Sequence, residues 1–234
     1  MGACPVVNAK RCTTGVKVDK ITRAHEGQYT REYNFIVSTT YLIGIDEAGR
    51  GPLAGPVAVG AVMLPLDFDW GLIEGVRDSK KLSEKKREEL FERTRELERS
   101  SLLHVAVSTS SALYIDTYGI VPAIKRALKE ALSRFEVEPS DCRVLLDGSL
   151  AAPGEFIHQE TIVGGDDTEP VISLASIMAK VTRDRLMRRL AAKYPAYDFD
   201  VHKGYGTLKH RETILKRGLC NIHRQSFCRK LERA

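Results

Sequence analysis

Two apolar segments that run into acidic residues limit what this chain can fold into. Residues 41–45 form a short apolar run followed directly by Asp46 and Glu47, and residues 143–146 form another that is followed by Asp147. Short apolar runs bounded by turn residues are typical of buried strands, so we expect each acid to lie where a strand ends. Further strands are predicted at residues 57–64, 102–108 and 161–163.

Helical periodicity appears between these strands. Residues 83–99 are rich in charge, with Leu90 and Leu97 one heptad apart, which predicts a surface helix. Pro122 suits the first turn of a second helix, whose apolar stripe comprises Ile124, Leu128, Leu132 and Phe135. A long helix is predicted from about Leu174, with an inward face of Ile177, Met178, Val181 and Leu190. Strands that alternate with helices indicate an α/β domain with a mixed β-sheet covered by helices.

Charge is distributed unevenly along the chain. From Ser176 onward there are fifteen Lys/Arg against five Asp/Glu, a net of +10, whereas the whole chain carries +5. Beyond Tyr194 we expect further helix around a loop at residues 202–207. A basic helical region of this kind is either a solvated surface or a phosphate-binding one, and the acidic segments above favour phosphate contact.

The first 38 residues are polar and mildly basic and show no sustained period. We expect them to form a flexible extension outside the fold. Their scattered charges argue against a secretory signal and a membrane span. The five cysteines include no C-x-x-C pair, which argues against a zinc site and a disulfide framework. A soluble, cytoplasmic protein with reduced thiols is therefore expected.

Carboxylates at the ends of neighbouring strands suit hard divalent cations such as Mg²⁺ or Mn²⁺. Two such ions would support phosphodiester hydrolysis, with Asp46, Glu47 and Asp147 as ligands. A single acid after a strand more often caps a turn, but two strands that end in this way weaken that alternative. Adjacent residues of a regular strand face opposite sides, so Asp46 and Glu47 share a site only if the chain bends, as Gly49 and Gly51 would allow.

The chain resembles the ribonuclease HII family in five motifs that occur in the family order: IDEAGRGPLAGPVAVGAV (45–62), DSKKL (78–82), LLDG (145–148), SLASIMAKVTRD (173–184) and HKGYGT (202–207). Five ordered motifs are far more specific than any one of them. The resemblance implies a ribonuclease-H-like mixed β-sheet flanked by helices. It implies a catalytic domain over residues 39–195 and a helical, basic, substrate-binding region over residues 196–234.

The resemblance also implies catalytic and metal-binding roles for Asp46, Glu47, Asp147 and Asp166. The family has a Lys-Gly-Asp-like segment at the last position, whereas this chain reads Gly164-Gly165-Asp166-Asp167. The lysine is absent, so Asp167 competes with Asp166 for the fourth position. Asp184 is a further acid, but it is flanked by arginines, and we interpret it as part of a structural ion pair.

Substrate recognition is assigned by the same resemblance. Gly49, Arg50 and Gly51 are implied to read the ribonucleotide, since glycines let the backbone approach a sugar and only the 2′-OH distinguishes RNA from DNA. Tyr205 is implied to stack on the sugar beside the RNA–DNA junction. Lys80 is the best phosphate-contact candidate because it lies within a motif, and weaker candidates are Lys81, Lys180, Arg183 and Lys203.

The expected activity is endonucleolytic hydrolysis of RNA in RNA–DNA hybrids and on the 5′ side of ribonucleotides embedded in duplex DNA, as in ribonucleotide excision and primer removal. Two Mg²⁺ or Mn²⁺ ions are the expected cofactors, and a monomer with unknown protein partners is expected. The alternatives are ribonuclease HIII, a DNA resolvase of the same fold, a non-catalytic nucleic-acid-binding domain and a small-molecule phosphatase. The complete Gly49-Arg50-Gly51 argues against ribonuclease HIII, and a substrate pair that differs in one 2′-OH separates the resolvase.

Overall fold

The computed structural model describes residues 39–76, 82–229 and 231 of the 234-residue chain. Lys80, with the rest of residues 77–81, lies outside the described residues, as does the predicted extension 1–38. The chain from Thr39 onward forms one compact unit, which includes the basic C-terminal region.

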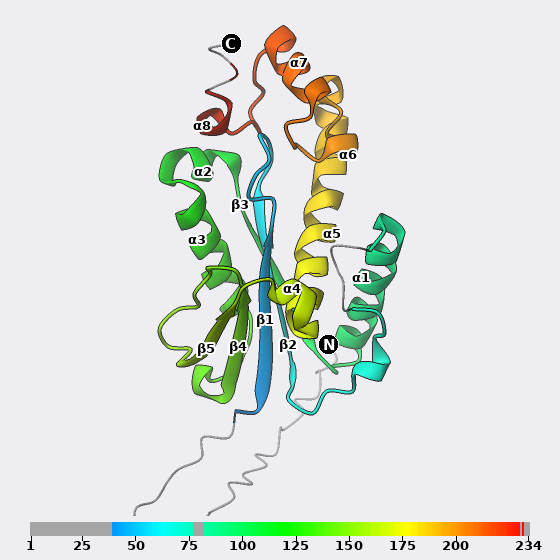
Figure 1. The fold of residues 1–234 in the computed structure, drawn as a ribbon, viewed down its shortest axis with the longest axis vertical. Helices are drawn as coiled ribbons and strands as arrows, with labels where there is room; N and C mark the ends of the chain where they lie inside the picture. Colours follow the sequence, from blue (N-terminus) through cyan, green and yellow to red (C-terminus); the bar gives the residue numbers. More distant parts are fainter. Residues whose placement is uncertain (1–38, 77–81, 230, 232–234) are drawn as a thin grey trace, which may run out of the picture. The chain divides into compact units, whose positions relative to one another are not determined.

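A five-stranded mixed sheet lies at the centre of this unit, with strand order β3-β2-β1-β4-β5 (Figure 1). The antiparallel strands β1, β2 and β3 are followed across the sheet by β4 and β5, which run parallel to β1. The strands are β1 (Tyr41–Ala48), β2 (Val57–Pro65), β3 (His104–Ser110), β4 (Cys142–Asp147) and β5 (His158–Ile162). All five strands predicted from the sequence are present, and β5 begins three residues earlier than predicted.

The first strand was predicted to end at Asp46 and Glu47, and β1 extends one residue further, to Ala48. The reason is its partner, because β2 keeps pairing with β1 as far as Ala48 opposite Ala58. The acids therefore lie within a hydrogen-bonded strand and not in a bend after it.

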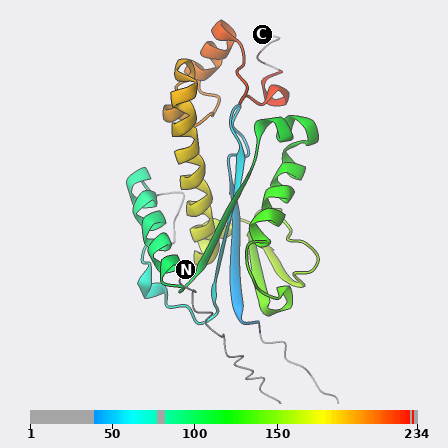
Figure 2. The same ribbon diagram turned by 180° about the vertical axis from the view of Figure 1, so that it is seen from behind.

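Helices cover both faces of the sheet (Figures 1 and 2). One face is packed by α3 (Ile120–Leu132), which follows α2 (Ala112–Tyr118). The other face is packed by α5 (Pro170–Lys193), with α1 (Glu84–Arg99) on its outer side. The predicted helices are confirmed, but α5 begins four residues before Leu174. Pro170 supplies that start, since its fixed φ suits the first helical turn.

Two glycines let α5 lie directly on the sheet. A Cβ atom on Gly44 of β1 would lie 2.3 Å from the carbonyl oxygen of Val171, and one on Gly60 of β2 would lie 2.4 Å from that of Ala175. Both distances are far below van der Waals contact. The bare backbone at these positions therefore brings the N-terminal half of α5 against β1, which carries Asp46 and Glu47, and against its neighbour β2.

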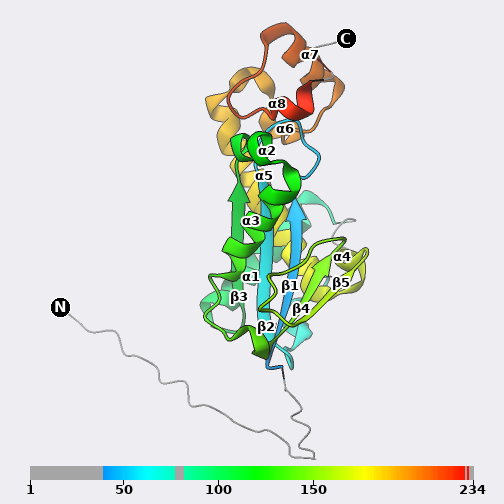
Figure 3. The same cartoon turned by 90° about the vertical axis from the view of Figure 1, so that its left-hand side faces the viewer.

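The C-terminal region forms a small helical cap at one end of the sheet (Figure 3). It contains the short helices α6 (Phe199–His202), α7 (Leu208–Arg217) and α8 (Gln225–Cys228). The predicted loop at residues 202–207 lies between α6 and α7, and it carries Tyr205. Phe199 is fully buried at the centre of this cap, where its ring stacks on that of Tyr197 at 5.4 Å.

Candidate active site

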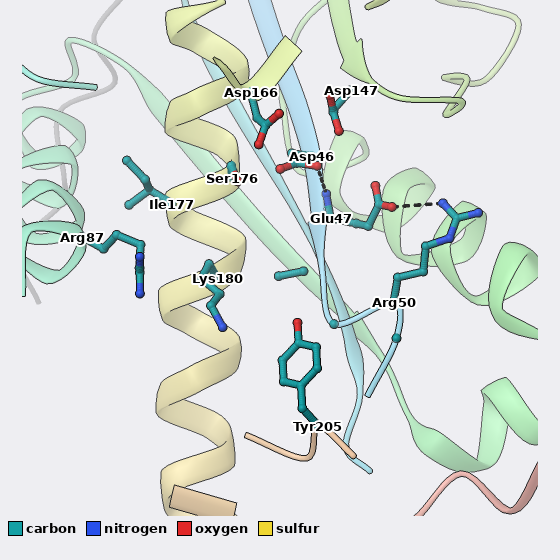
Figure 4. Close-up of a pocket in the computed structure, with 13 residues that line it drawn as sticks. Asp46, Glu47, Arg50, Arg87, Asp147, Asp166, Ser176, Ile177, Lys180 and Tyr205 are labelled. Atoms are coloured by element: carbon teal, nitrogen blue, oxygen red, sulfur yellow. Dashed lines mark hydrogen bonds and ion pairs between the residues drawn. The ribbon is translucent and has the colours of Figure 1, made fainter. Parts of the chain in front are cut away.

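Four carboxylates from three elements line one open cleft of about 420 Å³ (Figure 4). Asp46 and Glu47 come from β1, Asp147 from the end of β4, and Asp166 from α4 (Gly165–Thr168). Strands β1 and β4 run parallel and stay paired up to Ile45 opposite Leu146, which places Asp46 beside Asp147.

The short helix α4 is tied to β4 at the site itself. The backbone N–H of Gly165 donates to Asp147 Oδ1 at 2.8 Å. The Ser173 hydroxyl of α5 donates to the backbone carbonyl of Asp166. These two contacts fix the position of Asp166, whose side chain is only 2% exposed.

The cleft concentrates negative charge on buried and half-buried carboxylates. Burial raises the pKa of Asp46 to about 7; the Ser176 hydroxyl lowers it, and the neighbouring Glu47 and Asp147 raise it further. Burial also raises the pKa of Glu47, against the effect of Arg50, whose Nη1 donates to Glu47 Oε1 at 3.1 Å. Desolvation and nearby like charge raise the pKa of both carboxyl groups, and a cation bound in the cleft would lower both pKa values.

The donor set fits a hard divalent cation. Every candidate ligand is a carboxylate oxygen, and these are the ligands that Mg²⁺ and Mn²⁺ prefer. Throughout the described part of the chain, no three His, Cys, Asp or Glu side chains converge closely enough to enclose an ion as they stand. Asp46 Oδ1 instead accepts from the backbone N–H of Glu47 at 2.7 Å. Rotation of these short side chains would be needed to coordinate an ion.

Asp46 and Glu47 do face in different directions, as the strand geometry requires. Asp46 points toward α5, where Ser176 lies, whereas Glu47 points away from α5 toward Arg50 (Figure 4). Both nonetheless line the same cleft. The expected bend between them is therefore unnecessary, because the cleft spans both sides of the strand.

The residues expected to read the ribonucleotide line the same cleft. Gly49, with φ +90°, is buried against Arg183, whose Nε would lie 2.0 Å from a Cβ atom there. Gly51 is exposed, and a Cβ atom there would meet nothing within 4 Å. Tyr205 is 43% exposed, and the Nζ atom of Lys180 lies 5.7 Å from the centre of its ring. Substrate-reading candidates and carboxylates thus share one surface.

The structure separates several candidates that the sequence left together. Asp166 lines the cleft, whereas Asp167 is exposed and is not among the residues that line it. Asp184 forms the expected ion pair, with Lys180 Nζ at 3.0 Å. Arg183 was wrongly expected to contact phosphate, because it is fully buried and donates to the backbone carbonyls of Pro56 and Ala54.

Four cleft residues were not singled out as site candidates from the sequence, namely Ala48, Arg87, Ser176 and Ile177, the last of which was expected only on the inward face of its helix. Ser176 matters most because its side chain hydrogen-bonds to Asp46. Its signal was present, since Ser176 and Lys180 are four residues apart within one motif and therefore share a helix face. Arg87 had no such signal, because it lies on α1 among many charged residues.

The fold and the acidic cleft define a ribonuclease-H-type hydrolase. A family model for Ribonuclease HII matches residues 43–230. The ribonuclease HII of Ruminiclostridium cellulolyticum is 44% identical over 230 residues, which cover 92% of this chain and 86% of that protein. The chain therefore belongs to the ribonuclease HII family, and it is an endonuclease of the ribonuclease H type that acts on RNA in RNA–DNA hybrids. The alternative of ribonuclease HIII is thereby set aside.

Solved structures agree with this assignment. A chain in the PCNA:RNase HII complex from Archaeoglobus fulgidus has a TM-score of 0.64 and 28% identity, covering 78% of this chain and 93% of that one. Bst-RNase HIII in complex with Mn²⁺ has a TM-score of 0.57 at 15% identity, covering 90% of this chain and 78% of that one, which shows the shared fold alone. Enzymes of the ribonuclease H family depend on divalent metal ions. Among the described residues, no helix has the length and apolar character needed to cross a bilayer.

Proposed function

We propose that this enzyme nicks duplex DNA on the 5′ side of single embedded ribonucleotides, in addition to cutting the RNA strand of longer hybrids. The observation that carries the proposal is the meeting, in one cleft, of four carboxylates with the Gly49-Arg50-Gly51 turn and Tyr205. The carboxylates supply the chemistry, and the turn with the tyrosine supplies contacts that depend on the sugar. Ribonucleotide excision and primer removal are the processes that such an activity serves.

Asp46, Glu47, Asp147 and Asp166 would hold two divalent ions, Mg²⁺ or Mn²⁺. When bound, the ions would supply an activated water and neutralise charge on the leaving oxygen. The Asp46 carboxyl, with its pKa near 7, would be held in its ionised form by that positive charge. Hydrolysis with the 3′ oxygen of the preceding nucleotide as leaving group gives 5′-phosphate and 3′-hydroxyl ends.

The turn at Gly49-Arg50-Gly51 would contact the ribonucleotide through its backbone, because exposed Gly51 has open space beside it that leaves room for a sugar. Tyr205 would stack on the sugar next to the junction, and Lys180 beside it would face a phosphate. Lys80, outside the described residues, is kept as a further phosphate contact. We expect the enzyme to act as a cytoplasmic monomer on nucleic acid, with no membrane partner.

The test uses a labelled DNA duplex that contains one ribonucleotide, with all-DNA and full RNA–DNA hybrid duplexes as controls, each with and without Mg²⁺ or Mn²⁺. A metal-dependent nick 5′ to the ribonucleotide is expected, and Asp147→Asn should abolish it. Equal cutting of the all-DNA duplex would instead support a resolvase-like DNA endonuclease. Cutting of the long hybrid alone would remove the junction roles of Arg50 and Tyr205.

The fourth carboxylate has a matched pair of variants. Asp166→Asn should lose metal-dependent cleavage, whereas Asp167→Asn, changed at the adjacent exposed residue, should keep it. Both substitutions remove one negative charge from the same short helix, so general electrostatics affects them alike. The opposite result would transfer the role to Asp167.

A further inference from the structure

A buried arginine from the C-terminal cap reaches the turn that is expected to read the ribonucleotide. Arg224, just before α8, has 0% exposure. Its Nη2 donates to the carbonyl of Gly49 at 2.6 Å, its Nη1 to that of Arg50 at 2.9 Å, and its Nε to that of Gly55 at 2.9 Å. The backbone N–H of Arg224 also donates to the carbonyl of Leu53 at 2.8 Å. One side chain thus binds three carbonyls of the connection between β1 and β2.

The guanidinium of Arg224 forms no direct ion pair within the described part of the chain, although Asp116 acts on it electrostatically. No Asp or Glu lies within ion-pair distance of Arg224 among the residues that the structure describes. The second buried guanidinium, Arg183, is also bound by backbone carbonyls. Burial, together with repulsion from Arg183 and against the opposing effect of Asp116, lowers the pKa of Arg224 to about 9, so Arg224 stays protonated at neutral pH. Among the described residues neither guanidinium forms a direct ion pair, and two such buried cations are a costly way to stabilise a fold.

The hydrogen bonds from Arg224 also fix the orientation of two peptide groups in the Gly49-Arg50-Gly51 turn. The carbonyl of Gly49 lies in the same planar trans peptide as the N–H of Arg50, and the carbonyl of Arg50 in the same peptide as the N–H of Gly51. Within a trans peptide the C=O and N–H bonds point in opposite directions. Because Arg224 holds both carbonyls toward the protein interior, the N–H groups of Arg50 and Gly51 are directed away from it. Residues 49–51 line the cleft on that outer side.

We propose that Arg224 is a positioning residue that aims the N–H groups of Arg50 and Gly51 at the sugar 2′ oxygen and its phosphate, and so sets the preference for a ribonucleotide. This inference rests on the proposed function, since it needs the Gly49-Arg50-Gly51 turn to contact the ribonucleotide. It also explains the two buried positive charges of Arg183 and Arg224, because they lie beneath a surface that would contact the negatively charged nucleic acid.

The experiment compares two DNA duplexes that differ at one nucleotide, which carries either 2′-OH or 2′-fluorine. Fluorine is a poor hydrogen-bond acceptor, so the ratio of kcat/KM for the two duplexes reports contacts to the 2′ oxygen. Arg224→Lys keeps the positive charge but cannot bridge three carbonyls, because an ammonium is a point donor without a planar fork. The ratio should fall by about tenfold in this variant, roughly the effect of one well-aligned hydrogen bond.

A purely structural role for Arg224 would lower the amount of folded enzyme and leave the ratio unchanged. The control is Ile124→Ala on α3, a fully buried residue of the opposite core, which destabilises the fold without touching the turn. Its ratio should match that of the wild type. All measurements are made at a temperature where circular dichroism shows each variant folded.

Asp116→Ala provides a second variant in case Arg224→Lys does not fold. The Asp116 carboxylate accepts from the backbone N–H groups of Gln225 at 2.8 Å and Ser226 at 3.0 Å, so it anchors the residues after Arg224. Its removal should lower the ratio in the same direction by a smaller factor. If the wild type prefers 2′-OH and neither variant changes the ratio, Arg224 does not position the turn. If the wild type itself shows no preference, the proposed function of the turn fails instead.

Discussion

Lowering the pH from about 7.5 to about 5 should destabilise this protein through two buried histidines of the C-terminal cap. His210 Nδ1 lies 2.8 Å from the carbonyl oxygen of Tyr205, so that nitrogen carries a proton. The backbone N–H of Cys220 donates to His223 Nδ1 at 2.9 Å, so the proton of His223 is on Nε2. That proton fits the 3.1 Å contact between His223 Nε2 and His210 Nε2. Both rings are therefore neutral, and a second proton on either would face another donor.

The magnitude follows from the depressed pKa values. Burial lowers the pKa of His210 and of His223 from 6.5 to about 4. The unfolded chain therefore binds protons first as pH falls, and the stability present above pH 6.5 is lost between pH 6.5 and 4. At pH 5 the loss amounts to about 2 kcal/mol for each histidine. The sum for the two is an upper bound because they share a hydrogen bond.

The assay must separate the pH dependence of stability that comes from the histidines from the part that comes from the carboxylates. Asp46, with its pKa raised to about 7, acts in the opposite sense, because its penalty grows as pH rises from 3.8 through 7. Chemical denaturation of wild type and His223→Gln at both pH values cancels the contribution of Asp46. Glutamine keeps an N–H near the Nε2 position but does not titrate. The free energy of unfolding should fall by about 2 kcal/mol less in the variant than in the wild type.

Equal losses in the two proteins would refute this reasoning. That result would mean that His223 is solvated and titrates near its ordinary pKa in the folded state. A parallel measurement of the histidine ring protons by NMR would then show titration near pH 6.5. The consequence for function is direct, since His210 holds the carbonyl of Tyr205 and acidification would loosen that loop.

Further predictions concern the sheet and the cleft. Gly44→Ala should prevent folding or lower the free energy of unfolding by several kcal/mol, because its Cβ would lie about 2.3 Å from the Val171 oxygen. Gly51→Ala should leave the melting temperature unchanged, since its Cβ would meet nothing within 4 Å, and should reduce cleavage at the ribonucleotide. Asp46→Asn should stabilise the metal-free protein by about 2–4 kcal/mol at pH 8, measured by denaturation, while abolishing cleavage. Tyr205→Ala should lower kcat/KM by about tenfold or more, and Tyr205→Phe should retain most of it, because stacking needs only the ring. An unchanged Tyr205→Ala enzyme would exclude stacking.

Local sequence patterns were enough to predict the framework of the site. Apolar runs located the strands that carry Asp46 and Asp147, and helical periodicity located α1, α3 and most of α5. These patterns work because burial repeats every two residues in a strand and about every 3.6 in a helix. The boundaries were less secure. β1 extends to Ala48 because β2 pairs with it that far, and the sequence of residues 46–48 does not predict this pairing.

The resemblance to a family named the candidate residues, and the tertiary structure showed where each of them lies. It placed Asp166 in the cleft and Asp167 outside it, and it placed Arg183 in the interior. It also brought Arg224 to Gly49 across 175 positions of the chain.

The sequence by itself determined which chemical groups are available and which segments form strands and helices. Only the tertiary structure decided which distant groups hold the reactive ones in place. The physical reason is that periodicity and composition report each residue's own exposure to water. A hydrogen bond between a buried arginine and a remote carbonyl leaves no local pattern, because it depends on how two separately formed elements pack.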